Sequence, residues 1–148
     1  MVVSVFADAS WSNHYKKGGW GCWVKSGRGT AKAHGAFKVE LRTSNDAELC
    51  AALNAIVWAL KRGIAMDGDL VLVQSDCMRV VQLMSGMQSR LSPAEKSAMK
   101  LLAELKKTRS LTIRARHVPG HTAGDQPRLW VNNLCDELAR KGFDKARK

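Results

Sequence analysis

Runs of apolar residues, and then a stretch with the two-residue period of a half-buried β-strand, predict strands in the first third of the chain. Val2–Asp8 is a β-branched run that ends on a carboxylate, and Gly19–Lys25 is a second run. Alternation over Thr30–Arg42 predicts a third, antiparallel strand. The segment Ser26–Thr30 contains two glycines and is the predicted hairpin turn between the second and third strands.

The period then changes to that of an amphipathic helix, because apolar residues from Leu49 to Leu60 recur at helical spacing. Asn45 is the predicted N-cap of this helix, and Gly63 is its predicted stop. The next apolar run, Leu70–Val73, is short and uninterrupted. Such a run is typical of an interior parallel strand that is covered on both faces.

The second half of the chain continues with helices and one further strand. A short helix is predicted over Met78–Met84, and the motif SPAE at 92–95 is a capping box that begins another helix. Alternation returns over Leu111–Val118, and a final helix is predicted from about Leu129 to Lys141. The order β-β-β-α-β-α-α-β-α predicts an α/β fold, with a mixed five-stranded sheet and helices on both faces. Three strands are antiparallel and the later ones follow by parallel crossovers.

The chain has 148 residues, of which 24 are Lys or Arg and 13 are Asp or Glu, so its formal net charge is +11. This length suits a single domain over 1–148, and no internal repeat or linker divides it. A domain this basic commonly binds a polyanion, most often nucleic acid, although a solvated basic surface is the alternative. We find neither a membrane-spanning run nor a signal peptide, and we expect a cytoplasmic protein.

The cysteines show no CxxC spacing and lie in apolar segments. This pattern favours free, buried thiols in a reducing compartment over a zinc site. The residues concerned are Cys22, Cys50, Cys77 and Cys135.

Acidic residues stand where predicted strands end or helices begin. Asp8 ends the first strand, Asp76 follows the run at 70–73, and Glu48 lies in the first turn of the long helix. In α/β sheets ligands bind at the carboxyl ends of strands, and Asp136 of the final helix can join this group. Clustered carboxylates repel one another unless a hard divalent cation, Mg²⁺ or Mn²⁺, neutralises them. Two such ions roughly 3.5–4 Å apart can clamp the oxygens of a phosphodiester, which predicts a nuclease.

Each acid also has an ordinary alternative role. Glu48 stands three residues after the predicted N-cap and can complete a capping box, and Asp76 can cap the short helix. Asp8 can be a turn residue and Asp136 a solvated helix acid. We favour the cluster because three of the acids stand at element junctions. His121 lies in a loop between two glycines, where it can move protons near a metal or be inert.

Short motifs follow one another along nearly the whole chain, beginning with FADAS at 6–10, GGWG at 18–21 and TSNDAEL at 43–49. These three resemble the first strand, the second strand and the helix start of ribonuclease H of type 1, the bacterial and retroviral-like class. SD at 75–76, VPGHT at 118–122 and NNLCDELA at 132–139 resemble its later motifs. Each motif is weak alone, but the ordered set is specific and spans nearly the whole chain.

The resemblance implies a ribonuclease H-like fold and endonucleolytic cleavage of the RNA strand of RNA/DNA hybrids. It further implies two Mg²⁺ or Mn²⁺ ions and products with 5′-phosphate and 3′-hydroxyl ends. The implied catalytic residues are the metal ligands Asp8, Glu48, Asp76 and Asp136, together with a mobile histidine, His121. The implied substrate contacts are Asn45 and main-chain groups near Ser10 and Trp11 at ribose 2′-hydroxyls, and Thr43 at a DNA phosphate.

The chain departs from the family at several positions. Asp46 stands where many members place an arginine that helps to hold a DNA phosphate, and an acid would repel phosphate. Residues 122–135 form a longer connection than in common members. The segment Ser85–Leu91 is too brief for the basic helical protrusion of some bacterial members. Hybrid affinity is therefore expected to depend on other cations, such as Lys16, Lys17, Lys106, Arg114 and Arg116.

Two other functions stay open at this point. One is a different nuclease of similar fold, such as a junction resolvase or a DNA nuclease, and the other is a non-catalytic hybrid-binding module. The chain shows no obvious self-association stripe, so we expect a monomer.

Overall fold

The computed structural model describes residues 1–87, 89–119 and 127–147, and these form one mixed sheet flanked by helices. The sheet has five strands in the order β3-β2-β1-β4-β5. Antiparallel pairing joins β1 (Val2–Ser12) to β2 (Lys17–Ser26), and β2 to β3 (Gly29–Ala36). Parallel pairing joins β1 to β4 (Leu70–Ser75), and β4 to β5 (Thr112–His117). The predicted fold class is confirmed.

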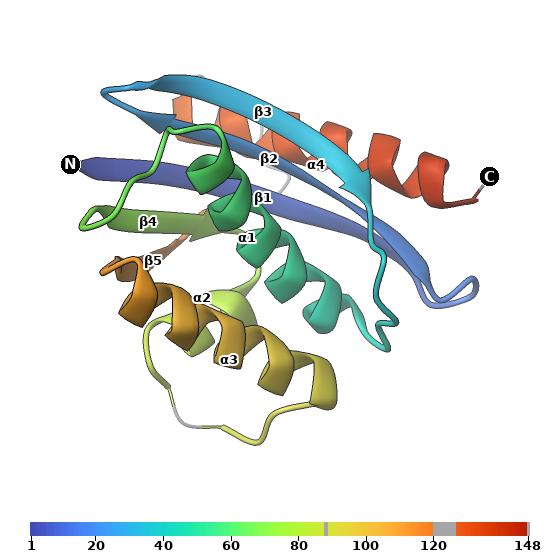
Figure 1. The fold of residues 1–148 in the computed structure, drawn as a ribbon. Helices are drawn as coiled ribbons and strands as arrows, with labels where there is room; N and C mark the ends of the chain where they lie inside the picture. Colours follow the sequence, from blue (N-terminus) through green and yellow to red (C-terminus); the bar gives the residue numbers. More distant parts are fainter. Residues whose placement is uncertain (88, 120–126, 148) are drawn as a thin grey trace.

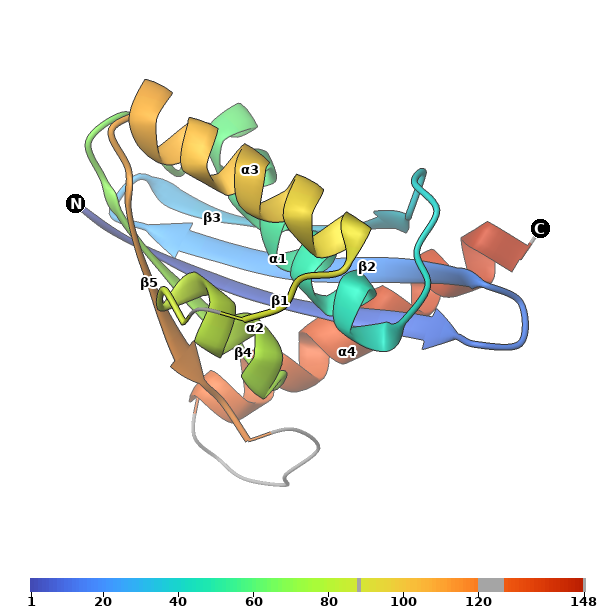
Figure 2. The same cartoon turned by 90° about the horizontal axis from the view of Figure 1, so that it is seen from below.

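Helices cover both faces of the sheet. The helices α1 (Ser44–Lys61), α2 (Met78–Met84) and α3 (Pro93–Thr108) share one hydrophobic core with the sheet. The helix α4 (Pro127–Arg147) packs on the opposite face, and Figure 1 shows it behind the strands that α1 covers in front. Figure 2, turned by 90°, shows the sheet between α1 and α4. No helix of the described residues is both long and apolar enough to span a membrane.

The start of α1 differs from the prediction. Its N-cap is Thr43, whose Oγ1 accepts a hydrogen bond from the Asp46 backbone N–H at 3.1 Å, so the prediction of Asn45 as N-cap is wrong. Thr43 has the extended backbone that an N-cap needs, whereas Asn45 already lies inside the helix. The predicted stop at Gly63 is confirmed, because its φ of +71° is the left-handed conformation that commonly ends a helix.

The strand β3 is shorter than predicted. Its ladder with β2 stops where Gly19 pairs with Ala36, although the alternation in the sequence continues to Arg42. Phe37 N–H still donates to Gly18 O at 3.1 Å, and then the chain leaves the sheet. Val39, which the alternation placed on the buried side, is 62% exposed. The alternation in the sequence does not show where hydrogen bonding between β2 and β3 stops.

The later elements agree better with the sequence. The short helix spans Met78–Met84 as predicted, and the capping box is present: Ser92 Oγ accepts from Glu95 N–H at 3.1 Å. The last helix extends further at both ends than the predicted 129–141. In β4, Val71 and Val73 are fully buried, but Leu70 and Leu72 are half-buried. We expected neighbouring elements to bury both faces of β4, but only the face that carries Val71 and Val73 is fully buried.

Small residues let α1 lie close to the sheet. The helix buries five alanines, and a short side chain permits a close approach of backbones. The buried alanines are Ala47, Ala51, Ala52, Ala55 and Ala59. This close packing holds the first turn of α1, which carries Glu48, beside β1.

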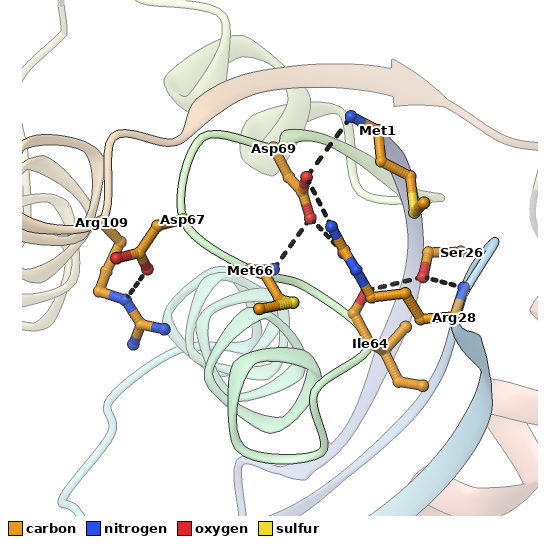
Figure 3. Close-up of polar contacts among 8 residues, drawn as sticks. All are labelled: Met1, Ser26, Arg28, Ile64, Met66, Asp67, Asp69 and Arg109. Atoms are coloured by element: carbon orange, nitrogen blue, oxygen red, sulfur yellow. Dashed lines mark hydrogen bonds and ion pairs between the residues drawn. The ribbon is translucent and has the colours of Figure 1, made fainter.

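An ion pair fastens the turn before β4 to the β2–β3 hairpin. Arg28 donates to both oxygens of Asp69, at 2.6 and 3.2 Å, and Met66 N–H donates to the same carboxylate at 2.9 Å (Figure 3). The α-amino group of Met1 lies 3.5 Å from it. Asp69 is 3% exposed, and the hydrogen bond from Arg28 is the main cause that lowers its pKa to about 2. These contacts hold the edge of the sheet at which β1, β2 and β4 come together.

We predict that Asp69 makes the fold sensitive to acid. Its pKa is lower in the folded state than the ordinary value of 3.8, so its stabilisation is present above about pH 4 and is lost as the pH falls towards 2. The shift corresponds to about 2 kcal/mol. Urea unfolding between pH 2 and 6 should show this loss in the wild type and not in Asp69→Asn. The control Asp67→Asn removes an exposed partner of Arg109 and should keep the wild-type pH profile; equal profiles in all three proteins would contradict the prediction.

Candidate active site

Parallel pairing brings two acids to one edge of the sheet. Phe6 of β1 lies opposite Gln74 of β4, so the register places Asp8 beside Asp76, two residues further along each chain. Asp8 is 3% exposed, and Asp76 directly follows the last residue of β4. The carboxyl ends of parallel strands are where ligands bind in α/β folds.

Glu48 reaches the same edge from α1. Its Oε1 accepts a hydrogen bond from Ala9 N–H at 3.2 Å, and the same N–H donates to Asp8 Oδ1 at 2.9 Å. The alternative role of Glu48 in a capping box with Asn45 is therefore wrong, because its carboxylate turns to β1 and Asn45 is not the N-cap. Asp8, Glu48 and Asp76 each offer an oxygen, and these oxygens all lie within 4.8 Å of one another.

The three carboxylates disturb one another electrostatically. Burial is the first cause that raises the pKa of Asp8, and the charge of Asp76 raises it further. Burial also raises the pKa of Glu48, followed by the charges of Asp8 and Asp76. Among the described residues, no group donates to the buried Oε2 of Glu48. An all-oxygen, negatively charged cluster with an unused buried acceptor fits a hard divalent cation such as Mg²⁺ or Mn²⁺.

The fourth predicted acid stands slightly apart. Asp136 of α4 is not part of the group within 4.8 Å, although its charge also raises the pKa of Asp8. Its Oδ2 lies 3.1 Å from Nη2 of Arg140, one helical turn further on. Arg140 was missed in the sequence, where the only signal was its spacing of four residues from Asp136. The structure thus brings three acids together and places the fourth close by, paired to a cation.

Glycines in β2 determine how closely α4 approaches. A Cβ on Gly21 would lie 2.6 Å from Ala139 N, and a Cβ on Gly19 would lie 2.0 Å from Phe143 N. Gly21 is also the β2 partner of Asp8. The bare backbone of β2 therefore lets α4 pack directly against the strand next to Asp8, and this contact carries Asp136 towards the cluster.

The predicted substrate contacts lie near this edge. Ser10 and Trp11 are half-buried near the end of β1, and no group among the described residues accepts from the buried Trp11 Nε1. Thr43 and Asn45 are exposed at the start of α1. His121 lies outside the described residues, as does most of the connection that precedes α4.

Asp46 is a structural residue in this chain. It is 2% exposed, and its carboxylate accepts hydrogen bonds from Ser92 Oγ at 2.7 Å and from Arg42 N–H at 3.3 Å. The acid expected to repel phosphate is therefore buried and bonded within the protein, where it joins α1 to the N-cap of α3. The cations expected to hold nucleic acid are all exposed: Lys16, Lys17, Lys106, Arg114 and Arg116.

Two further contacts at the site were not foreseen. His117, at the end of β5, has its Nε2 3.2 Å from Asp76 O. Cys77 has its Sγ 3.6 Å from Asn45 Oδ1, so it links α2 to α1. The sequence indicated neither contact, because each joins segments at least 30 residues apart.

The sheet order is that of the ribonuclease H-like fold, and the acidic cluster at the ends of β1 and β4 is a candidate site for a divalent cation. The family model described as RNase H matches residues 1–144, and the chain belongs to the RNase H family. This membership supports a nuclease of the hydrolase class.

Solved structures share the fold at low sequence identity. The N-terminal RNase H domain of a Mycobacterium tuberculosis protein, solved as a fusion with maltose-binding protein, has 22% identity and a TM-score of 0.74, over 99% of this chain and 96% of that one. RNase H1 of the halophilic archaeon Halobacterium salinarum has 21% identity and a TM-score of 0.74, over 99% and 100%. LC11-RNase H1, solved in complex with RNA/DNA hybrid, has 20% identity and a TM-score of 0.75, over 99% of both chains. The comparison with curated proteins gave no match.

We predict that Gly21→Ala destabilises the protein. The new methyl group would overlap the backbone of α4, and overpacking of this kind typically costs about 1–3 kcal/mol. Urea unfolding measures the loss. Gly27→Ala is the control, because its Cβ would meet only the flexible Met1 side chain, at 3.2 Å. A Gly21 variant as stable as the Gly27 variant would show that α4 does not depend on this close approach.

We predict that divalent cations stabilise the fold more at high pH than at low pH. The raised pKa values mean that the folded protein holds protons which the unfolded chain releases, so without a cation its stability falls as the pH rises above about 4. Thermal unfolding with Mg²⁺ or with EDTA should therefore give a larger Mg²⁺-induced rise in Tm at pH 8 than at pH 5. Asp8→Asn removes a repelling charge, and it should raise Tm in EDTA and reduce the response to Mg²⁺. Glu104→Gln, at an exposed site on α3, should respond like the wild type, and a full Mg²⁺ response in Asp8→Asn would contradict the prediction.

Proposed function

We propose that this protein is an endonuclease that hydrolyses the RNA strand of RNA/DNA hybrids with two divalent cations, and that it leaves 5′-phosphate and 3′-hydroxyl ends. The observation that carries the proposal is the group of Asp8, Glu48 and Asp76, whose oxygens lie within 4.8 Å of one another in a chain of the RNase H family. The similarity of fold to LC11-RNase H1, which was solved in complex with RNA/DNA hybrid, supports this class of substrate.

The acids would hold Mg²⁺ or Mn²⁺ at the sheet edge, with Asp136 as the fourth ligand. When bound, such a pair of ions supplies a nucleophile from water and offsets the charge on the leaving oxygen. Glu48 would offer its buried Oε2 to a cation, since Oε1 is bonded to Ala9 N–H while Oε2 has no donor among the described residues. Asp136 Oδ2 lies 3.1 Å from Arg140 Nη2, so this ion pair would compete with a cation for the Asp136 carboxylate.

The remaining residues would bind the hybrid and move a proton. The exposed amide of Asn45 stands one helical turn before Glu48, where it can contact the 2′-hydroxyl that only RNA carries. Ser10 and Trp11 approach the same strand through the end of β1, and Thr43 and the exposed cations hold phosphates. His121 would take up or release a proton as product leaves, which is a role for an imidazole at neutral pH.

The test is cleavage of an end-labelled RNA/DNA hybrid in Mg²⁺ or in EDTA, with analysis of the product ends. We expect cleavage of the RNA strand only in Mg²⁺. Asp8→Asn should retain the fold and the bound hybrid but lower turnover by more than about a hundredfold, since even outer-shell partners of a metal typically contribute 10–100-fold. Asp67→Asn, on an exposed acid of the ion pair with Arg109, is the matched control and should cut normally.

Other substrates decide between the remaining functions. Preferred cleavage of single-stranded RNA, duplex RNA or a branched DNA junction would contradict the proposal. Tight binding of the hybrid without cleavage under any divalent cation would indicate a binding module instead.

A further inference from the structure

Cys77 occupies an unusual position for its side chain. It directly follows Asp76 and is the N-cap of α2. Burial raises the pKa of its thiol, and the backbone N–H groups of Val80 and Arg79, in the first turn of α2, partly offset that rise. The Cys77 backbone N–H donates to Ser75 Oγ at 3.1 Å, which fixes the turn after β4. The same Sγ also faces α1, where it donates to Asn45 Oδ1 at 3.6 Å. The side chain thus joins the two elements that deliver Asp76 and Glu48.

This contact decides which end of the Asn45 amide faces solvent. An amide has one acceptor oxygen and one nitrogen with two donors. With the oxygen held by the thiol, the amide nitrogen of Asn45 is directed away from α2. Asn45 is exposed and lies three residues before Glu48, so the two residues share one side of the helix. A hydrogen-bond donor is therefore presented beside the acidic cluster.

We propose that Cys77 is a positioning residue that orients the Asn45 amide to donate to a ribose 2′-hydroxyl of the substrate. The inference rests on the proposed function and adds a residue that selects RNA over DNA. An exposed asparagine loses side-chain freedom when it binds, and a partner that already holds the amide lowers that cost.

The backbone beneath Asn45 is held as well. Asp46, the next residue, accepts from Ser92 Oγ and from Arg42 N–H, and its own N–H donates to Thr43 Oγ1. The helix start is thus anchored from α3 on one side, while Cys77 holds the side chain from α2 on the other. Removal of the thiol leaves the first anchor intact, so its effect should fall on the Asn45 amide and not on α1 as a whole.

The experiment measures ribose discrimination in Cys77→Ala, Cys77→Ser, Asn45→Ala and the double variant with alanine at both positions. One probe is an RNA/DNA hybrid, and the others are copies of it that each carry one 2′-deoxynucleotide at a different position around the cleavage site. Binding is measured in EDTA so that no cleavage occurs. The readout for each protein is the Kd of each substituted hybrid divided by the Kd of the intact hybrid. Steady-state kcat and KM on the intact hybrid in Mg²⁺ are measured alongside, and Cys50→Ala is the control, because this half-buried thiol of α1 has no hydrogen bond to Asn45.

In Cys77→Ala the discrimination ratio should fall about three- to tenfold, as expected for one hydrogen bond, and KM should rise more than kcat falls. Cys77→Ser should restore the ratio, because a hydroxyl can donate to the same oxygen. The double variant should lose no more than Asn45→Ala, and Cys50→Ala should behave like the wild type. An unchanged ratio in Cys77→Ala, or additive losses in the double variant, would overturn the inference even if Tm falls.

The behaviour of the wild-type protein distinguishes a failure of the proposed function from a failure of the inference about Cys77. A wild type that neither cleaves the hybrid nor distinguishes the 2′-deoxy probe would overturn the proposed function together with this inference. If the wild type cleaves the hybrid and distinguishes the 2′-deoxy probe, and Cys77→Ala has the same discrimination ratio, only the role of Cys77 is overturned.

Discussion

Repulsion between three carboxylates at one sheet edge is the constraint on which the site depends. Asp8 and Asp76 are neighbours because β1 and β4 are parallel and in register, and Glu48 is pressed towards them by the close packing of α1. The arrangement is costly in isolation, since burial and mutual charge raise the pKa values of Asp8 and Glu48. A fold that keeps such a cluster must hold it by contacts elsewhere, and a divalent cation would relieve the strain.

Those contacts come from both faces of the sheet. On one face, alanines bring α1 against β1, and a continuous polar chain joins the starts of three helices. Arg79 of α2 donates to both oxygens of Glu95, Ser92 joins Glu95 to Asp46, and Asp46 holds the segment before α1. On the other face, Gly19 and Gly21 leave room for α4. The elements that carry the acids, β1, β4 and α1, are therefore held together by contacts on both faces of the sheet.

The proposed substrate contacts lie on the same elements as the acids. Asn45 and Thr43 belong to α1, and Cys77 follows Asp76 without a break, so cation binding and contact with a ribose would share one rigid support. At Asp46 the residue type differs from that of many family members, yet the start of α1 is still held in place by hydrogen bonds. Where many members have an arginine for phosphate, this chain has a buried acid that locks α1 to α3. Under the proposed function, the cations that lie exposed on the surface would bind phosphate instead.

The sequence alone determined the parts that depend on local periodicity. Strand and helix periods predicted the element order and the mixed sheet, and the capping box at Ser92 and the glycine stop at Gly63 were readable because they use neighbouring residues. The junction positions of Asp8, Glu48 and Asp76 were readable in the same way. Only the tertiary structure decided the end of β3, because its pairing with β2 stops at Gly19 and Ala36 although the alternation in the sequence continues. It also decided the N-cap at Thr43, the pairing of Asp136 with Arg140 and the contact between Cys77 and Asn45. The N-cap required a choice between Thr43 and Asn45, which both suit the position locally. The contact between Cys77 and Asn45 joins residues far apart in the chain, and only tertiary packing brings their atoms together.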